Sequence, residues 1–415
     1  MSQHSRVRPS RSGRHLAGAS TDGQHVHAHG PLPAASRHTR RIVTAILVPA
    51  ALATFVAMIL LWPGHADVSG KQAGDQGGVR ALGTVIAVVE QSCPPTARRQ
   101  RCGSATVRVT DGPGAGTTTV VDLPDGPGAP ALHIDDDIVL LHAPRALPGG
   151  PDYTVTDHQR STPMAWMLGL TGLAILAFGR LRGVASLAGL AVSFAVLLLF
   201  IVPAIIDGSP PLLVAVVGAS AIMFAALYLT HGVTVHTSVA VAGTLASLVL
   251  TGLLGAAFTA AMQLTGVAGD DDAFLAANRG DLDMRGLLLA GIVIGALGVL
   301  DDVTVTQAAT VAEMAAAGPT TRLNLYRAAS RIGRAHVASA VNTIVLAYAG
   351  AALPLLVLIA TARQPVSQLL TSELLAQEIL RSAVGTIGLV ASVPITTALA
   401  AMVADLRPRP LRATT

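Results

Sequence analysis

An apolar stretch of the sequence carries two adjacent carboxylates, Asp301 and Asp302, followed by hydroxyl and amide side chains as far as Gln307. An ionisable group at membrane depth is costly, so it is expected to face protein or water and to mark a functional site. The helical pattern continues to the Gly-Pro breaker at 318–319, which predicts one helix over 286–316, about 45 Å long. Four polar residues, spaced by 4, 4 and 3, share one face of that helix: Asp302, Thr306, Thr310 and Glu313.

This stripe predicts the wall of a cavity that opens to the cytoplasm and binds a proton, a cation or a small solute, with Asp301 turned about 100° away from it. The alternative is that the carboxylates only mark the cytoplasmic end of a span. Carboxylates at a helix C-terminus oppose the helix dipole, which counts against that alternative. His336 and Asn342 are secondary candidates, although packing at a membrane interface or inside a bundle also accounts for both.

The sequence holds no motif that would predict catalysis. It lacks a phosphate-binding loop, a zinc-binding His-Glu pair and a Gly-x-Ser-x-Gly turn. An intramembrane aspartyl protease would need a second Asp on a facing span, and none is apparent. We therefore expect no catalytic residue, no cofactor and no metal, and an enzyme is the least supported class of function.

The composition indicates a polytopic membrane protein. The 415 residues are 51% hydrophobic and 13% charged, against about a quarter charged in soluble proteins. The apolar segments are each near the ~20 residues that cross a bilayer. About eight transmembrane helices are predicted, at 42–62, 164–179, 183–205, 211–230, 237–264, 286–305, 336–362 and 382–404. The net charge of +4 comes largely from arginines beside these segments, so the lipid bilayer is the expected partner and nucleic acid is not.

Arginine placement predicts the topology. Under the positive-inside rule, the arginine-rich segments lie in the cytoplasm and the acidic loops outside, which places both termini inside at the bacterial plasma membrane. The first span is interpreted as a retained anchor, although a signal peptide cleaved near residue 66 is an alternative. The expected domains are a disordered cytoplasmic tail (1–41), the anchor helix (42–62), an extracytoplasmic β-rich domain (63–162), a seven-helix bundle (163–405) and a cytoplasmic tail (406–415).

The predicted extracytoplasmic region contains short β-like runs separated by Gly-Pro turns. They fall at 82–89, 105–110, 117–122, 138–142 and 153–156, a spacing typical of a small barrel or sandwich. Cys93 and Cys102 both lie in this region. A disulfide is expected if the region is outside the cell, and two free thiols are the alternative.

From about residue 81 to 404 the chain resembles the YibE/F-like family of bacterial membrane proteins. The strongest element is 295–308 with 313–314, in which Asp302 fits the Asp of the family pattern. Two further elements are 331–350 and 153–160. The chain departs from the family at Ala335, where members often have Asp, and at 136–137, where Asp-Asp replaces Gly-Asp. The resemblance implies an exported β-rich domain followed by a membrane bundle.

Two functions follow from these observations. The first is a transporter or permease for a small solute or cation that uses the Asp-bearing helix. The second is a non-enzymatic scaffold or envelope sensor in which the exported domain binds a partner and the arginine-rich segment 322–334 contacts a cytoplasmic partner or anionic lipid. Either could act as a homo-oligomer or with an unidentified protein partner.

Overall fold

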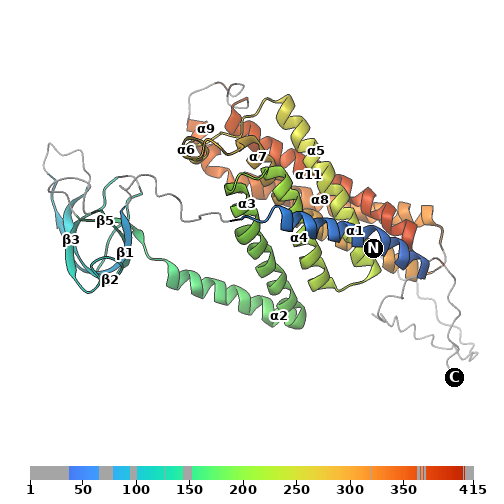
Figure 1. The fold of residues 1–415 in the computed structure, drawn as a ribbon, viewed down its shortest axis with the longest axis horizontal. Coiled ribbons are helices and arrows are strands. Elements are labelled where there is room, and N and C mark those ends of the chain that lie inside the picture. The colour runs from blue at the N-terminus through green and yellow to red at the C-terminus, as the bar shows by residue number, and fades with distance from the viewer. Residues whose placement is uncertain are drawn as a thin grey trace, which may run out of the picture. The chain divides into compact units, whose positions relative to one another are not determined.

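The computed structural model describes residues 37–64, 78–93, 101–126, 128–143, 152–318, 320–361, 365, 368, 371–404 and 406. It contains mostly helices and one small antiparallel sheet (Figure 1). The predicted disordered tail lies outside the described residues up to residue 36, and so does the C-terminal tail apart from residue 406. Helix α1 (Arg37–Leu60) therefore begins five residues before the predicted anchor.

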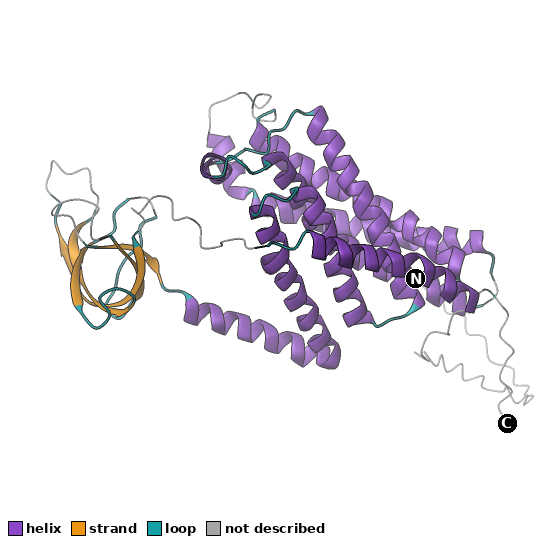
Figure 2. Ribbon diagram, in the orientation of Figure 1, coloured by secondary structure: helices purple, strands orange, loops and turns teal. Residues whose placement is uncertain are grey.

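All five predicted β runs are strands. They are β1 (Val79–Gln91), β2 (Cys102–Asp111), β3 (Thr118–Asp122), β4 (Asp137–His142) and β5 (Tyr153–His158). They pair antiparallel in the order β3-β2-β1-β4-β5. The outer strands β3 and β5 contact each other, so the sheet curls onto itself (Figure 2). The Tyr153 hydroxyl donates to the Pro113 carbonyl at 2.9 Å and ties β5 to the β2–β3 turn.

The curled sheet has its own apolar core. Alternate residues of the strands point inward, and Val85, Val107, Ile138 and Leu140 are fully buried. Cys93 and Cys102, at the β1–β2 connection, are joined by a disulfide, with their Cα atoms 5.1 Å apart. The β domain therefore has an apolar core and a covalent link of its own.

A carboxylate and two imidazoles meet beside the turn that precedes β4. Asp136 Oδ2 accepts a hydrogen bond from the His133 backbone N–H at 2.7 Å and lies 3.4 Å from the ring nitrogens of both His133 and His158. Partial desolvation raises the pKa of Asp136, but the His133 N–H and the His158 imidazole outweigh it. The pKa of this carboxyl is therefore below its ordinary value.

Among the described residues, six helices are long and apolar enough to cross a membrane. They are 39–60 in α1, the run 161–206, α4 (Pro211–His231), α5 (Val235–Ala261), α7 (Met284–Ala316) and α11 (Glu373–Val403). The predicted count of eight is not confirmed, and two segments account for the difference.

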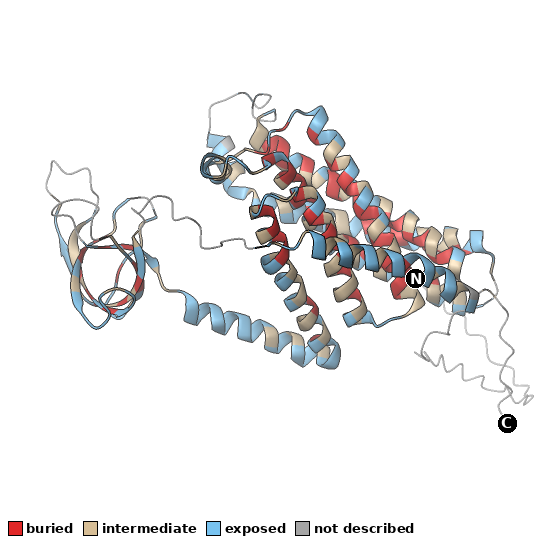
Figure 3. Ribbon diagram, viewed as in Figure 1, coloured by how far each residue is buried: buried red, intermediate tan, exposed pale blue. Residues whose placement is uncertain are grey.

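The first difference is the run 161–206, which was predicted as two spans. It consists of α2 (Ser161–Val196), the π-helical turn η1 (Leu197–Ile201) and α3 (Val202–Ile206). Arg180 has non-helical backbone angles, with φ at +51°, and kinks α2. Figure 1 shows that α2 has two arms joined by a sharp bend. Before this turn, α2 is exposed along its length (Figure 3), with Phe178 95% exposed. An apolar helix without a protein cover fits lipid contact.

The second difference is the predicted span 336–362. It falls on α8 (Arg322–Ala351) and α9 (Leu353–Thr361), which are interrupted at Ala352, two residues before Pro354. Proline lacks the N–H that a continuing helix needs, which explains the break. Nine residues are too few to span, and α8 carries four arginines in its first half. A further helix, α6 (Asp270–Asn278), begins at the predicted acidic loop and carries the three aspartates in its first turn.

Helix α7 is the central element of the bundle, in contact with α4, α5, α8 and α11. Buried residues line the interior faces of these helices (Figure 3). Between α5 and α11 the contact is reciprocal: Gly243 lies under Thr396, and Gly388 lies under Thr251. A methyl group on either glycine would overlap the facing threonine hydroxyl. Small residues of this kind let membrane helices approach closely.

Gly243→Ala is expected to destabilise the bundle by about 1–3 kcal/mol, because the added methyl group overpacks the contact with Thr396. Gly291→Ala is the matched control, since no atom lies near the added methyl group there. It should be neutral or slightly stabilising, as alanine is the better helix former. Thermal unfolding of the purified protein in detergent measures both. Equal stability of the two variants would contradict the tight contact.

The β domain is expected to lose protection as the pH falls below about 4, and Asp136→Asn should weaken that dependence. The sign follows from the lowered pKa: the ionised Asp136 stabilises the fold above its unfolded pKa, and this stabilisation is lost as pH falls through the folded pKa. Hydrogen exchange of β4, corrected for the intrinsic rate at each pH, measures it. Asp111→Asn is the charge-removal control. An unchanged pH dependence in Asp136→Asn would contradict the role of this carboxylate.

Candidate functional site

The predicted long helix is confirmed, since α7 covers Met284–Ala316. The predicted stripe lies on its outward face: Asp302, Thr306 and Glu313 are exposed, and Thr310 is half-buried. The Thr310 hydroxyl donates to the Thr306 carbonyl at 2.8 Å. Within the described residues, no side-chain hydrogen bond or ion pair joins Asp302 or Glu313 to another helix. The structure therefore does not bring these four side chains to a buried site, and their role as a pathway stays a prediction.

A different set of polar side chains is buried on the opposite face of α7. Gln307 is 4% exposed and donates to the Ala329 carbonyl of α8 at 3.0 Å and to the Thr397 hydroxyl of α11 at 2.7 Å. Its amide oxygen lies against Gly333 of α8, where a Cβ would collide with it. Gln307 thus joins three helices at one level of the bundle.

A hydroxyl pair lies one turn before Gln307. Thr304 and Thr244 of α5 are both fully buried, with their Oγ1 atoms 2.6 Å apart. Each also donates to its own helix: Thr304 to the Asp301 carbonyl at 3.0 Å and Thr244 to the Ala240 carbonyl at 3.0 Å. Each hydroxyl has only one proton, so the two hydroxyls can donate in only two of these three contacts at a time. Their oxygen atoms can still accept a further hydrogen bond.

Asp301 precedes this hydroxyl pair by one turn, and its backbone carbonyl accepts from Thr304. Its side chain is half-buried, and its Oδ1 atom is enclosed with no hydrogen-bond partner among the described residues. The fully buried Thr396 hydroxyl of α11 has no such partner either. A carboxylate withdrawn from water needs a proton, a cation or donors to stabilise it. Among the ionisable side chains that the structure describes, Asp301 is the one with a buried atom that lacks a partner, which makes it the candidate for binding a ligand.

Further buried hydroxyls follow α5 along its length. Five are no more than 1% exposed: Thr237, Thr244, Ser247, Thr251 and Thr259. Ser247 and Thr251 donate to carbonyls four residues earlier, which is ordinary for such residues in membrane helices. Sequence reasoning missed this row. The seven-residue spacing of Thr237, Thr244 and Thr251 on an apolar helix was the available signal.

The buried polar side chains that α5, α7 and α11 bring together are called the polar layer below. They are Asp301, Thr304, Gln307, Thr244, Thr396 and Thr397.

The remaining predicted residues lie apart from the polar layer. His336 and Asn342 are exposed on α8. Cys93 and Cys102 form the disulfide of the β domain. No group of three metal-ligating side chains occurs in the part of the chain that the structure describes.

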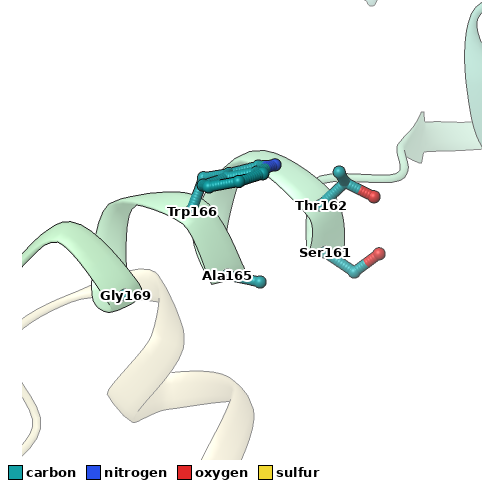
Figure 4. Close-up of a pocket in the computed structure, with 5 residues that line it drawn as sticks. All are labelled: Ser161, Thr162, Ala165, Trp166 and Gly169. Carbon is teal, nitrogen blue, oxygen red and sulfur yellow. The ribbon is translucent and has the colours of Figure 1, made fainter.

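A surface depression near the start of α2 does not extend the site. Its five lining residues come from the first turns of that one exposed helix (Figure 4). They are Ser161, Thr162, Ala165, Trp166 and Gly169. Its polar groups are two hydroxyls and the indole N–H of Trp166, and all of its lining residues come from one helix, so no second element could contact a ligand there.

Gln307→Leu is expected to destabilise the bundle by about 1–3 kcal/mol, because the Ala329 carbonyl and the Thr397 hydroxyl lose their donor. Thr306→Val, on the adjacent but exposed position, is the control and should change stability by less than about 0.5 kcal/mol. Denaturant unfolding in detergent measures the difference. Similar effects of the two substitutions would count against the buried amide contact.

The chain is similar to a known protein family over its helical, membrane part. The family model described as YibE/F-like protein matches residues 167–406, which contain the whole polar layer and leave the β domain outside. A search of curated proteins and a search of solved structures each found no match. The match covers more than half of the chain and confirms the family resemblance over the membrane part, while the predicted extension of the resemblance to residues 81–166 lies outside it. The chain belongs to the YibE/F-like protein family.

Proposed function

We propose that this membrane protein is a permease for a small solute or ion, and that Asp301 is the residue that binds the proton or cation. One observation carries the proposal: an enclosed carboxylate oxygen of Asp301 has no partner among the described residues, in a bundle of apolar helices. An ionisable group in that position is uncommon unless it faces a bundle interior and serves a function.

The neighbouring groups suit a hard cation or a proton. Hydroxyl, carbonyl and carboxylate oxygens are ligands for hard cations. The Thr304 hydroxyl, one turn after Asp301, contacts the Asp301 backbone carbonyl and the Thr244 hydroxyl. The hydroxyls of α5 provide further polar contacts along that helix. Because α5, α7 and α11 all pack against one another, we expect movement of these helices relative to one another to open or close access to Asp301.

We further propose that the protein lies in the bacterial plasma membrane with both termini in the cytoplasm. The support is a charge difference between the two ends of the bundle. The end where α7 finishes and α8 begins carries Arg322, Arg327, Arg331 and Arg334. The end where α7 and α11 begin is mainly acidic, with Asp270, Asp271, Asp272, Asp281, Asp283, Glu373 and Glu378. The positive-inside rule assigns the arginine end to the cytoplasm and the β domain to the outside. This arrangement requires the chain to cross the membrane twice within 161–206, on either side of Arg180, and once more within 322–361.

A non-enzymatic scaffold or envelope sensor is the second candidate. The observation in its favour is that the β domain has its own core and disulfide, as expected of a domain that binds a partner outside the cell. In this case the bundle serves as an anchor, and the polar layer only holds the helices together.

Asp301→Asn is expected to abolish ligand-dependent stabilisation while the protein still folds. Purified protein would be screened by thermal unfolding against monovalent cations, pH and small solutes. A ligand at a hundred times its dissociation constant stabilises the folded state by about 2.7 kcal/mol. The shift should disappear in Asp301→Asn and persist in Asp302→Asn, the matched control on the exposed face.

Other outcomes would redirect the proposal. Loss of the shift in Asp302→Asn alone would make the exposed stripe the pathway. An absence of any shift, together with loss of cellular function on deletion of 78–160 and a harmless Asp301→Asn, would favour the scaffold.

A further inference from the structure

Helix α8 has two faces of opposite character in its first half. Leu325, Ala329, Gly333 and Val337 recur every four residues and are buried. Leu325 and Ala329 pack with Ala308 and Val311 of α7 and with residues of α5 and α11. Together with the Gln307–Ala329 hydrogen bond, this stripe fixes the rotation of α8 about its axis.

Three arginines occupy the other side of the same segment. Arg327, Arg331 and Arg334 are spaced by 4 and 3, so they form one row, and all three are exposed. Within the described residues, none of their guanidinium groups makes a hydrogen bond or an ion pair. Arg322 adds a fourth exposed cation at the start of the helix.

The position of this row is that of a membrane interface. Leu325 packs where α7 and α11 end and α5 begins, so the arginine row lies at one end of the bundle. Beyond Val337 the helix continues with apolar residues. Leu323 and Ile332 are 55% and 49% exposed on the arginine-bearing half. Guanidinium groups on the same helical segment as exposed apolar side chains suit the boundary between lipid headgroups and acyl chains.

We propose that the arginine row of α8 binds the headgroups of anionic phospholipids. Guanidinium groups bind phosphate oxygens through two hydrogen bonds at once, and a row on one rigid helix presents several to neighbouring headgroups. The charge is complementary, and anionic lipid is abundant at the cytoplasmic face to which we assign this end of the bundle. The site is separate from the polar layer and does not depend on transport.

The test uses the full-length protein in nanodiscs. About a third of the lipid is phosphatidylglycerol and the rest is phosphatidylcholine. Lipids retained after mild detergent extraction are counted by mass spectrometry. The wild type should retain phosphatidylglycerol over phosphatidylcholine, and the triple variant R327Q/R331Q/R334Q should reduce that ratio about fivefold or more. Added salt should lower the ratio for the wild type.

Two further triple variants serve as controls, one that keeps the charge of the row and one that removes arginines elsewhere. R327K/R331K/R334K retains the charge and should recover part of the ratio, which a purely structural role of arginine would not predict. R80Q/R101Q/R108Q removes three exposed arginines from the β domain and should leave the ratio unchanged. If the α8 glutamine variant folds and keeps the wild-type ratio, the proposal is overturned, and the row must serve another ligand such as an acidic protein segment.

Discussion

The absence of water in the bilayer core is the constraint on which the bundle depends. A polar group buried there must find its partners within the protein. Helix α7 meets this requirement unevenly. Gln307 has two acceptors from two neighbouring helices, and Thr304 shares a contact with Thr244. Asp301, one turn away, keeps an enclosed oxygen without a described partner. The satisfied groups hold the helices together, and the unsatisfied one is where a ligand would have most effect.

Close helix packing makes this arrangement possible. Lipid tails are as apolar as leucine, so helices in a bilayer associate through packing and hydrogen bonds rather than by burying apolar surface from water. Gly243 and Gly388 bring α5 and α11 close enough for facing threonines to fit against bare backbone, and Gly333 does the same for Gln307. The glycines therefore set the spacing at which the hydroxyls of α5 and the amide of α7 can reach their neighbours.

The two parts of the chain rely on different physical effects. The β domain buries alternate strand residues in a core of its own and carries a disulfide. The membrane part is organised around one long helix that four others contact. The family match falls on the membrane part alone. The second proposal, lipid binding by α8, concerns the end of that part and draws on exposed charge rather than buried polarity.

Sequence periodicity by itself determined many of the local elements, although not the break between α8 and α9 or the short helix α6. All five strands and the extent of α7 were predicted, because alternation and helical spacing depend only on neighbouring residues. The residues of 295–308 and 331–350 also indicated the family, which the family model confirms. The rotation of α7 about its own axis could not be predicted in this way. The spacing of four polar residues showed that they share a face, but not where that face points. These residues are Asp302, Thr306, Thr310 and Glu313. Only the packing of α4, α5, α8 and α11 around α7 decided that Asp301, Thr304 and Gln307 are the residues turned toward the interior. The physical reason is that a helix is oriented by the sum of its contacts with distant segments, and no local pattern contains those contacts.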